Sequence, residues 1–235
     1  MLKYTKVLYT KKSGGSLPQL VAAETENMQS AYVVQKILEF REMGIPLEDM
    51  AVLFRSSFHS FDLEIELAKA NIPFRKYGGF KFIETAHVKD VIAYLRVLEN
   101  PKDVVSWNRI LLLLDGVGPR TAEKVINDIL DKRVGLAKEF REPVTATSKF
   151  WMDYNHYPEA IRELFTMLRD SMLSYRTPGE RTYHILQYYE PLMKNKYEDY
   201  VKRRKDLETF QNIAERYDSI SELLTDLALE PPTNS

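Results

Sequence analysis

The chain has 235 residues, of which 44% are hydrophobic and 29% charged, with a formal net charge of −1 and no cysteine. This composition is typical of a globular protein with one large or two small domains, and it excludes disulfides, thiolate chemistry and cysteine-based zinc sites. No apolar run near 18 residues and no signal-peptide pattern occurs, so we expect a cytoplasmic protein. The balanced charge is unusual for a dedicated nucleic-acid binder, which is generally basic.

The first third of the chain alternates between strand and helix patterns. Helical periods cover about residues 27–43, before Gly44, and about 61–70. The apolar run at residues 50–54 is typical of a strand buried on both faces of a parallel sheet. The expected strands are residues 6–10, 19–23, 50–54 and 74–77. This part therefore predicts an α/β unit with a small, mostly parallel sheet.

From Thr85 onward the apolar residues recur almost everywhere with a helical period. Asn100 and Pro101 end a first helix, Asp103 is placed to cap a second, and further apolar stripes predict three or four helices after residue 158. Aromatic and methionine side chains on these stripes are more typical of a core than of a ligand-binding box. The rest of the chain is thus expected to be mainly α-helical.

A glycine turn joins two of these expected helices. An apolar run ends at Asp115, Gly116-Val117-Gly118 follows, and Pro119 suits the first position of the next helix. The first-turn amides of that helix would face solvent, an arrangement that binds phosphate, and Arg120 and Lys124 could add charge beside it. The same residues also fit a plain Gly-Pro corner between two core helices, and the turn alone leaves both interpretations open.

No complete active site is visible in the sequence. A G-x-x-x-x-G-K-[ST] phosphate loop and a G-x-S-x-G elbow are both absent. The four histidines are far apart and lack metal-ligand spacing, so we expect no metal site. Residues 194–205 are rich in lysine and arginine; they read as a solvated helix face or, less simply, as a phosphate-facing patch.

Two ordered groups of residues together resemble the UvrD/Rep/PcrA group of superfamily 1 DNA helicases. The first is D-M-A-V-L-F-R-S-S at residues 49–57, followed by residues 60, 63 and 64. The second comprises residues 72–74, 78–82, 88–91, 94–96, 100–101 and 116–118. Each block alone is weakly specific, whereas their order and spacing are specific, most closely over residues 1–126.

The resemblance implies a domain organisation and a parent enzyme. Residues 1–84 would be a partial RecA-like (2A) segment, and residues 85–235 a helical 2B-type domain carrying a helix-hairpin-helix-like turn. The chain would be a fragment of an ATP-dependent DNA helicase, without the phosphate loop and the arginine finger. ATP and Mg²⁺ are then implied for the full-length parent, and no cofactor is expected in this segment.

The resemblance also implies DNA contacts. Duplex backbone contacts would come from Gly116, Val117, Gly118, Pro119, Arg120, Thr121 and Lys124. Candidate single-strand contacts are Arg55, Ser56, Ser57 and Phe61, where the Phe61 ring could stack a base or could be buried. The expected partners are duplex DNA, a single-strand/duplex junction and the rest of the helicase chain, with a protein partner possible and no membrane.

Two other interpretations compete with a duplex-gripping accessory region. The first is a non-enzymatic helical module for protein interactions, using the basic segment and exposed aromatic residues between Trp151 and Tyr157 to dock a partner. The second is a stand-alone, degenerate helicase relative. Loss of DNA binding when the glycine turn is altered would favour the duplex-gripping accessory region over the protein-interaction module.

Overall fold

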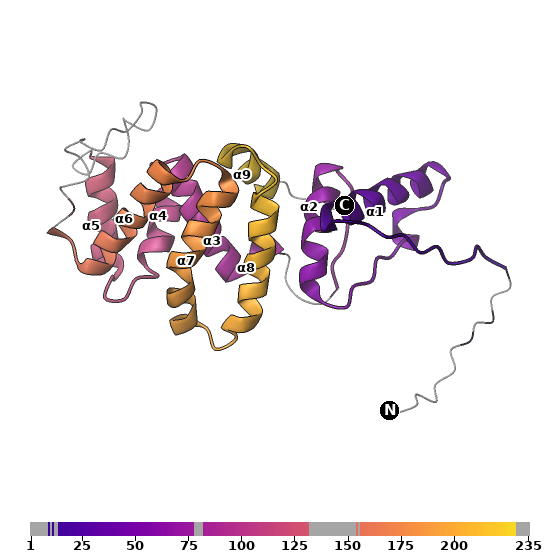
Figure 1. Ribbon diagram of the computed structural model, residues 1–235, viewed down its shortest axis with the longest axis horizontal. Coiled ribbons are helices and arrows are strands. Elements are labelled where there is room, and N and C mark those ends of the chain that lie inside the picture. The colour runs from indigo at the N-terminus through magenta and orange to yellow at the C-terminus, as the bar shows by residue number, and fades with distance from the viewer. Residues whose placement is uncertain are drawn as a thin grey trace.

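The computed structural model of the protein describes residues 9, 11, 14–77, 82–131, 154 and 156–228. These residues form α-helices, short 3₁₀ helices and irregular connections, and none of them lies in a β-strand. Figure 1 shows two neighbouring groups of helices, a small group with α1 and α2 and a larger bundle from α3 to α9.

The helix bounds follow the chain. The small group comprises α1 (Glu26–Glu42), the 3₁₀ helices η1 (Leu47–Asp49) and η2 (Ser57–Ser60), and α2 (Phe61–Lys69). The 3₁₀ helix η3 (Phe82–Glu84) precedes the bundle, which comprises α3 (Ala86–Glu99), α4 (Val104–Leu111), α5 (Pro119–Leu130), α6 (Glu159–Ser174), α7 (Pro178–Lys196), α8 (Tyr200–Ala214) and α9 (Ile220–Ala228). Within the described ranges, no helix is long and apolar enough to cross a membrane.

Local capping explains where several of these helices begin and end. The side chain of Asp103 accepts the Ser106 N–H at 3.0 Å and starts α4, as its position in the sequence predicts. A capping box of Thr177 and Glu180 starts α7. At the end of α1, Gly44 adopts a φ of 85°, and the next N–H bonds back to the carbonyl of Phe40, which completes a Schellman motif.

The predicted α/β unit is wrong. Residues 50–54 form no regular secondary structure, and within them Val52 is 41% and Leu53 is 92% exposed. Residues 19–23 and 74–77 likewise form no strand, and most of the expected strand at residues 6–10 lies outside the described residues. An apolar run records a preference for burial, but a strand also needs a neighbour that takes up its N–H and C=O groups. Here α1 and α2 pack on each other instead.

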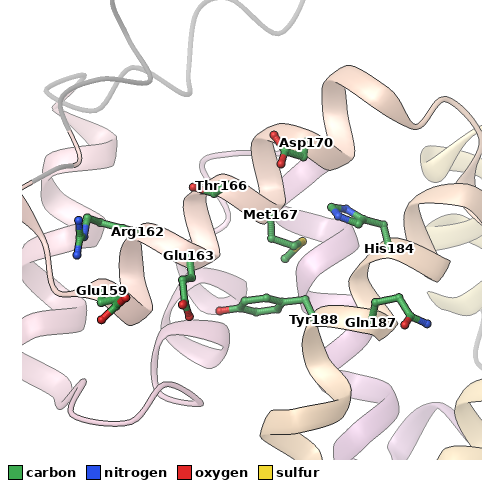
Figure 2. Close-up of a pocket in the computed structure, with 9 residues that line it drawn as sticks. All are labelled: Glu159, Arg162, Glu163, Thr166, Met167, Asp170, His184, Gln187 and Tyr188. Atoms are coloured by element: carbon green, nitrogen blue, oxygen red, sulfur yellow. The ribbon is translucent and has the colours of Figure 1, made fainter.

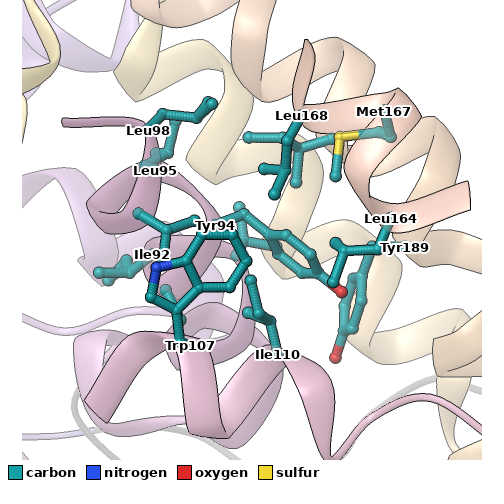
Figure 3. Close-up of a cluster of buried hydrophobic side chains, with 14 of the residues drawn as sticks. Ile92, Tyr94, Leu95, Leu98, Trp107, Ile110, Leu164, Met167, Leu168 and Tyr189 are labelled. Carbon is teal, nitrogen blue, oxygen red and sulfur yellow. The ribbon is translucent and has the colours of Figure 1, made fainter. Parts of the chain in front are cut away.

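The main hydrophobic core is built around α3. This helix packs against α4, α6, α7, α8 and α9, and its Tyr94 and Leu95 are fully buried. Figure 3 shows these residues beside Trp107 of α4 and Leu164 of α6. A large apolar side chain such as Leu95 or Leu164 contributes on the order of 2 kcal/mol when it leaves water. The indole Nε1 of Trp107 donates to the Pro101 carbonyl at 2.8 Å, so its one polar atom is satisfied.

Helix α2 belongs to two cores. Its Phe61 and Ile65 pack in the bundle core, whereas Leu63 and Leu67 join Ile72 in a second cluster against α1. A salt bridge of 3.2 Å from Lys69 Nζ to the carboxylate of Asp226 in α9 also connects α2 to the bundle. The domain division between residues 84 and 85 stays a prediction.

Buried polar side chains connect the helices of the bundle. Asp90 of α3 is almost fully buried and accepts hydrogen bonds from Arg109 Nε at 2.7 Å and from the Tyr189 hydroxyl at 2.6 Å. It therefore joins α3, α4 and α7 at one carboxylate. Burial, together with Asp90, raises the pKa of Tyr189 well above its ordinary value, so the phenol stays protonated and keeps donating.

His87 forms a second connection, between α3 and α8. Its Nδ1 lies 3.0 Å from Arg203 Nη1 and its Nε2 lies 3.0 Å from Asp206 Oδ2. Because a guanidinium can only donate, Nδ1 accepts from Arg203, and Nε2 carries the proton that is donated to Asp206. The His87 ring thus bridges two residues of α8, consistent with a structural role.

Candidate nucleic-acid interface

The glycine turn between α4 and α5 is held by backbone hydrogen bonds and by one glycine conformation. The Leu114 N–H bonds to the Leu111 carbonyl at 3.1 Å, and the Val117 N–H bonds to the Leu114 carbonyl at 3.2 Å. Gly116 has a φ of 75°, in the left-handed region that disfavours side chains with a Cβ. The turn therefore has a defined shape that the sequence at Gly116 specifies.

Buried side chains fix the turn to the bundle from both sides. Val117 is buried between two exposed glycines, and four residues of α5 face the core: Ala122, Val125, Ile126 and Ile129. This stripe is the one expected from the sequence. Gly118, Pro119, Arg120 and Lys124 are exposed, and Thr121 is half-buried, so the predicted contact residues, apart from the buried Val117, share one accessible end of the hairpin.

The exposed N-terminus of α5 has the features of an anion site. Gly118 is its N-cap, no side chain caps it, and Pro119 occupies the first turn. The amides of Arg120 and Thr121 lie in that first turn, whose N–H groups have no acceptor inside the helix. A Cβ placed on Gly118 would meet nothing within 4 Å. Packing around position 118 thus does not require glycine, and the space beside this N-cap is open.

The charge around this end is mixed. Arg120 and Lys124 lie one turn apart on α5, and neither forms an ion pair with another described residue. Asp115 and Glu123 are also exposed nearby in sequence. A contact with phosphate would therefore depend on the helix N-terminus and the two cations together, and not on a broad basic surface.

The four single-strand candidates do not share one accessible surface. Arg55 is exposed and Ser56 is half-buried, while the side chain of Ser57 lies outside the described residues. Phe61 is 2% exposed, and its ring stacks on Phe82 with 4.2 Å between centroids. Of the two alternatives for Phe61, the buried one describes the structure, so this ring is not open to a nucleic-acid base. In Figure 1, α5 lies at the side of the bundle that faces away from the small group containing α2.

Half of the lysine and arginine residues in the basic segment at residues 194–205 form ion pairs within the chain. Lys194 pairs with Glu190 at 3.0 Å, Arg203 with Asp199 at 2.6 Å, and Arg204 with Glu208 at 3.1 Å. These pairs fit a solvated helix face better than a phosphate-facing patch.

The proposed aromatic docking residues also differ from expectation. Tyr154 and Tyr157 are buried in the bundle core beside Phe165. Trp151 lies outside the described residues. The two tyrosines are therefore not available to dock a partner.

A groove between α6 and α7 was missed at the sequence level. It has a volume of about 560 Å³ and is lined by Glu159, Arg162, Glu163, Thr166, Met167, Asp170, His184, Gln187 and Tyr188, as Figure 2 shows. The signal was present, because the α6 residues Glu159, Glu163, Thr166 and Asp170 recur at helical spacing on the face opposite the apolar stripe. In the part of the chain that the structure describes, no cluster of three or more metal-ligating side chains occurs.

Comparison with known proteins supplies the family of this chain. The model of the UvrD-like helicase C-terminal domain matches residues 2–231, so the chain belongs to this family. This membership confirms the resemblance to UvrD/Rep/PcrA-type helicases.

Two relatives illustrate the match. The ATP-dependent DNA helicase PcrA of Staphylococcus aureus (strain Mu50) is 26% identical over 235 residues, covering 95% of this chain and 32% of that protein. PcrA of Staphylococcus epidermidis (strain RP62A) is 36% identical over 132 residues, covering 56% of this chain and 18% of the relative. The chain thus spans at most about a third of the length of these curated relatives.

Proposed function

We propose that the α4–α5 hairpin binds the phosphate backbone of duplex DNA, as an accessory contact in an ATP-dependent DNA helicase. The observation that carries this proposal is the uncapped, exposed N-terminus of α5 behind Gly118, with Arg120 and Lys124 beside it. The relatives, named as ATP-dependent DNA helicases, make DNA the partner that best fits such an anion site.

The geometry favours binding without sequence recognition. Amides and flexible cations contact phosphate, whereas the reading of bases needs side chains that enter a groove. Few phosphates can reach one helix end, so binding by this chain alone is weak and falls as salt rises. ATP hydrolysis and strand separation require chemistry that this segment's sequence motifs do not contain, so they are proposed for a complete helicase.

Single-strand contact is a separate part of the proposal. Arg55 and Ser56 remain candidates because they are accessible. Arg55→Gln is the appropriate variant for a contact of this kind, since it removes the charge while keeping a similar length.

Fluorescence anisotropy with a labelled, tailed hairpin duplex at low salt tests the duplex contact. The variant Gly118→Glu with Arg120→Glu fills the open space and places two carboxylates at the helix end, so we expect about a tenfold or greater loss of affinity. The matched control is Ala31→Glu with Arg41→Glu, which makes the same charge change on exposed positions of α1. An equal loss in both variants, or unchanged binding in the first, would contradict the proposed role of the turn.

A further inference from the structure

Helix α5, whose N-terminus carries the proposed phosphate contact, lies at the outer edge of the bundle (Figure 1). Among the described helices it packs mainly on α4, through the buried stripe of Ala122, Val125, Ile126 and Ile129. Hydrophobic contacts of this kind are non-directional, so they bury one face of the helix without fixing its rotation closely. A contact site needs its groups held within about 0.5 Å and roughly 10–20°. Such a site on α5 therefore requires a directional contact as well.

Asp128 of α5 makes a directional contact of this kind. The Tyr157 hydroxyl donates a hydrogen bond of 2.5 Å to Asp128 Oδ2. Asp128 is half-buried at the edge of the apolar stripe and comes one helical turn after Lys124, so both residues lie on the same side of α5. Hydrogen bonds to a carboxylate are among the stronger ones in proteins. The bond therefore holds the side of α5 that carries Lys124 in a defined orientation.

Tyr157 can act as a fixed point because core contacts hold its ring. The residue is 6% exposed, and its ring centroid lies 6.1 Å from that of Phe165 in α6. The Phe165 ring in turn lies 5.9 Å from that of Trp107 in α4. The His156 ring packs on Tyr157 with 4.1 Å between centroids. The tyrosine thus connects α5 to a core that α4 and α6 share.

We propose that Tyr157 is a positioning residue for the duplex contact, because its bond to Asp128 sets the rotation of α5 at which the helix N-terminus meets phosphate. Tyr157 is buried and acts through α5, without touching DNA. This inference rests on the proposed function of the α4–α5 hairpin and adds to it a residue from outside that hairpin. Without the hydroxyl, the aliphatic stripe stays packed but α5 rotates more freely, so fewer of its groups reach phosphate at once.

The test compares Tyr157→Phe, which removes the hydroxyl and keeps the ring, with Tyr217→Phe as a matched control. Tyr217 is also 6% exposed, and its hydroxyl donates to Asp226 of α9 at 2.9 Å. Anisotropy titrations with a tailed hairpin duplex over a range of salt measure affinity and its salt slope. We expect Tyr157→Phe to weaken binding about fivefold and to lower the magnitude of the slope by up to about 1, the contribution of one phosphate. Tyr217→Phe should change neither, and circular dichroism verifies that both variants are folded.

Asp128→Asn separates positioning from a simple effect of charge. Its amide oxygen can still accept from Tyr157, so we expect this variant to bind duplex at least as tightly as the wild type. With Tyr157→Phe added, binding should again weaken about fivefold, because the hydrogen bond is then missing. If Tyr157 only kept the carboxylate of Asp128 from pairing with Lys124, removing the charge would abolish the effect of Tyr157→Phe.

Three results would overturn the inference. Tyr157→Phe could leave affinity and salt slope unchanged while Arg120→Gln still lowers the slope, so that the duplex contact would stand without Tyr157. Tyr217→Phe could lose as much affinity as Tyr157→Phe, which would indicate a general loss of stability. Tyr157→Phe could also have no effect in the Asp128→Asn background. A salt slope that Arg120→Gln does not change would instead contradict the proposed duplex contact itself, and this inference would fall with it.

Discussion

At the scale of single residues, the two glycines of the hairpin have different physical reasons to be glycine. Gly116 needs its left-handed φ of 75°, whereas Gly118 has an ordinary φ and free space where a Cβ would stand. The first is required by the fold. The second is consistent with close approach of a ligand. Because glycine can serve either role, a motif read only from the sequence could not distinguish a structural corner from a binding turn.

Alanine at each glycine distinguishes these roles. We expect Gly116→Ala to lower the free energy of unfolding by about 1–2 kcal/mol, since a Cβ is strained in the left-handed region. Gly118→Ala should change it by less than about 0.5 kcal/mol while reducing the affinity for duplex DNA. Urea denaturation and anisotropy measure the two effects. A stability loss at Gly118 as large as at Gly116 would assign both glycines to the fold.

His184 provides a pH-dependent contribution to stability. Burial lowers the pKa of His184, although Asp170 acts in the opposite direction, and its Nδ1 lies 2.7 Å from the Ser171 hydroxyl. The folded-state pKa of His184 is below the unfolded value near 6.5. The neutral ring therefore contributes fully to the free energy of unfolding above about pH 6.5, and this contribution is lost as the pH falls through the folded-state pKa.

The free energy of unfolding of the wild type should therefore fall below pH 6.5 more steeply than that of His184→Gln, which cannot titrate at this position. Urea titrations of both proteins over this pH range measure the difference. Parallel pH profiles would show that His184 does not titrate differently in the folded and unfolded chains.

At the scale of helices, the sequence predicted those elements that local chemistry determines. Pro119 and the apolar stripe from Ala122 predicted α5, and Asp103 predicted the start of α4, because caps and helical periods act within a few residues. The segment at residues 50–54 was mistaken for a strand since pairing depends on residues far along the chain. The proposed duplex-contact residues come from one local motif, whereas the groove between α6 and α7 forms only where two helices meet.

The cap of α4 also positions the hairpin, because α4 leads directly into the glycine turn. Asp103→Ala removes the acceptor for the Ser106 N–H and hydroxyl, so we expect a loss of about 1 kcal/mol in the free energy of unfolding. Asp103→Asn, which can still accept from the backbone, should recover most of it. Urea denaturation of the two variants checks this expectation; equal losses would mean that the negative charge, and not the cap, is responsible.

At the scale of the whole molecule, the small helical group is connected to the bundle through α2. Phe61 and Ile65 share the bundle core, and the carboxylate of Asp62 pairs with Arg216, just after α8, at 2.5 Å. The other carboxylate oxygen of Asp62 is buried without a hydrogen-bond partner. The ion pair is therefore the main compensation for burying this charge.

Removing Arg216 should weaken the attachment of α1 and α2 to the bundle. Since Arg216 is partly exposed, we expect Arg216→Ala to cost about 1–3 kcal/mol, and Asp62→Asn with Arg216→Ala to recover part of that loss. Hydrogen exchange should show reduced protection first in α2. Unchanged protection in α2 would show that its apolar contacts alone maintain the attachment.

The salt dependence of duplex binding tests the central claim most directly, because phosphate contacts release counterions and each contributes a slope of about −0.9 in log K against log salt. Anisotropy titrations of the wild type and Arg120→Gln, over a range of salt and on two duplexes of unrelated sequence, provide this measurement. We predict a negative slope that is the same for both duplexes and that decreases in magnitude by about 1 in Arg120→Gln. A slope that the substitution leaves unchanged would contradict a phosphate contact at the α4–α5 hairpin.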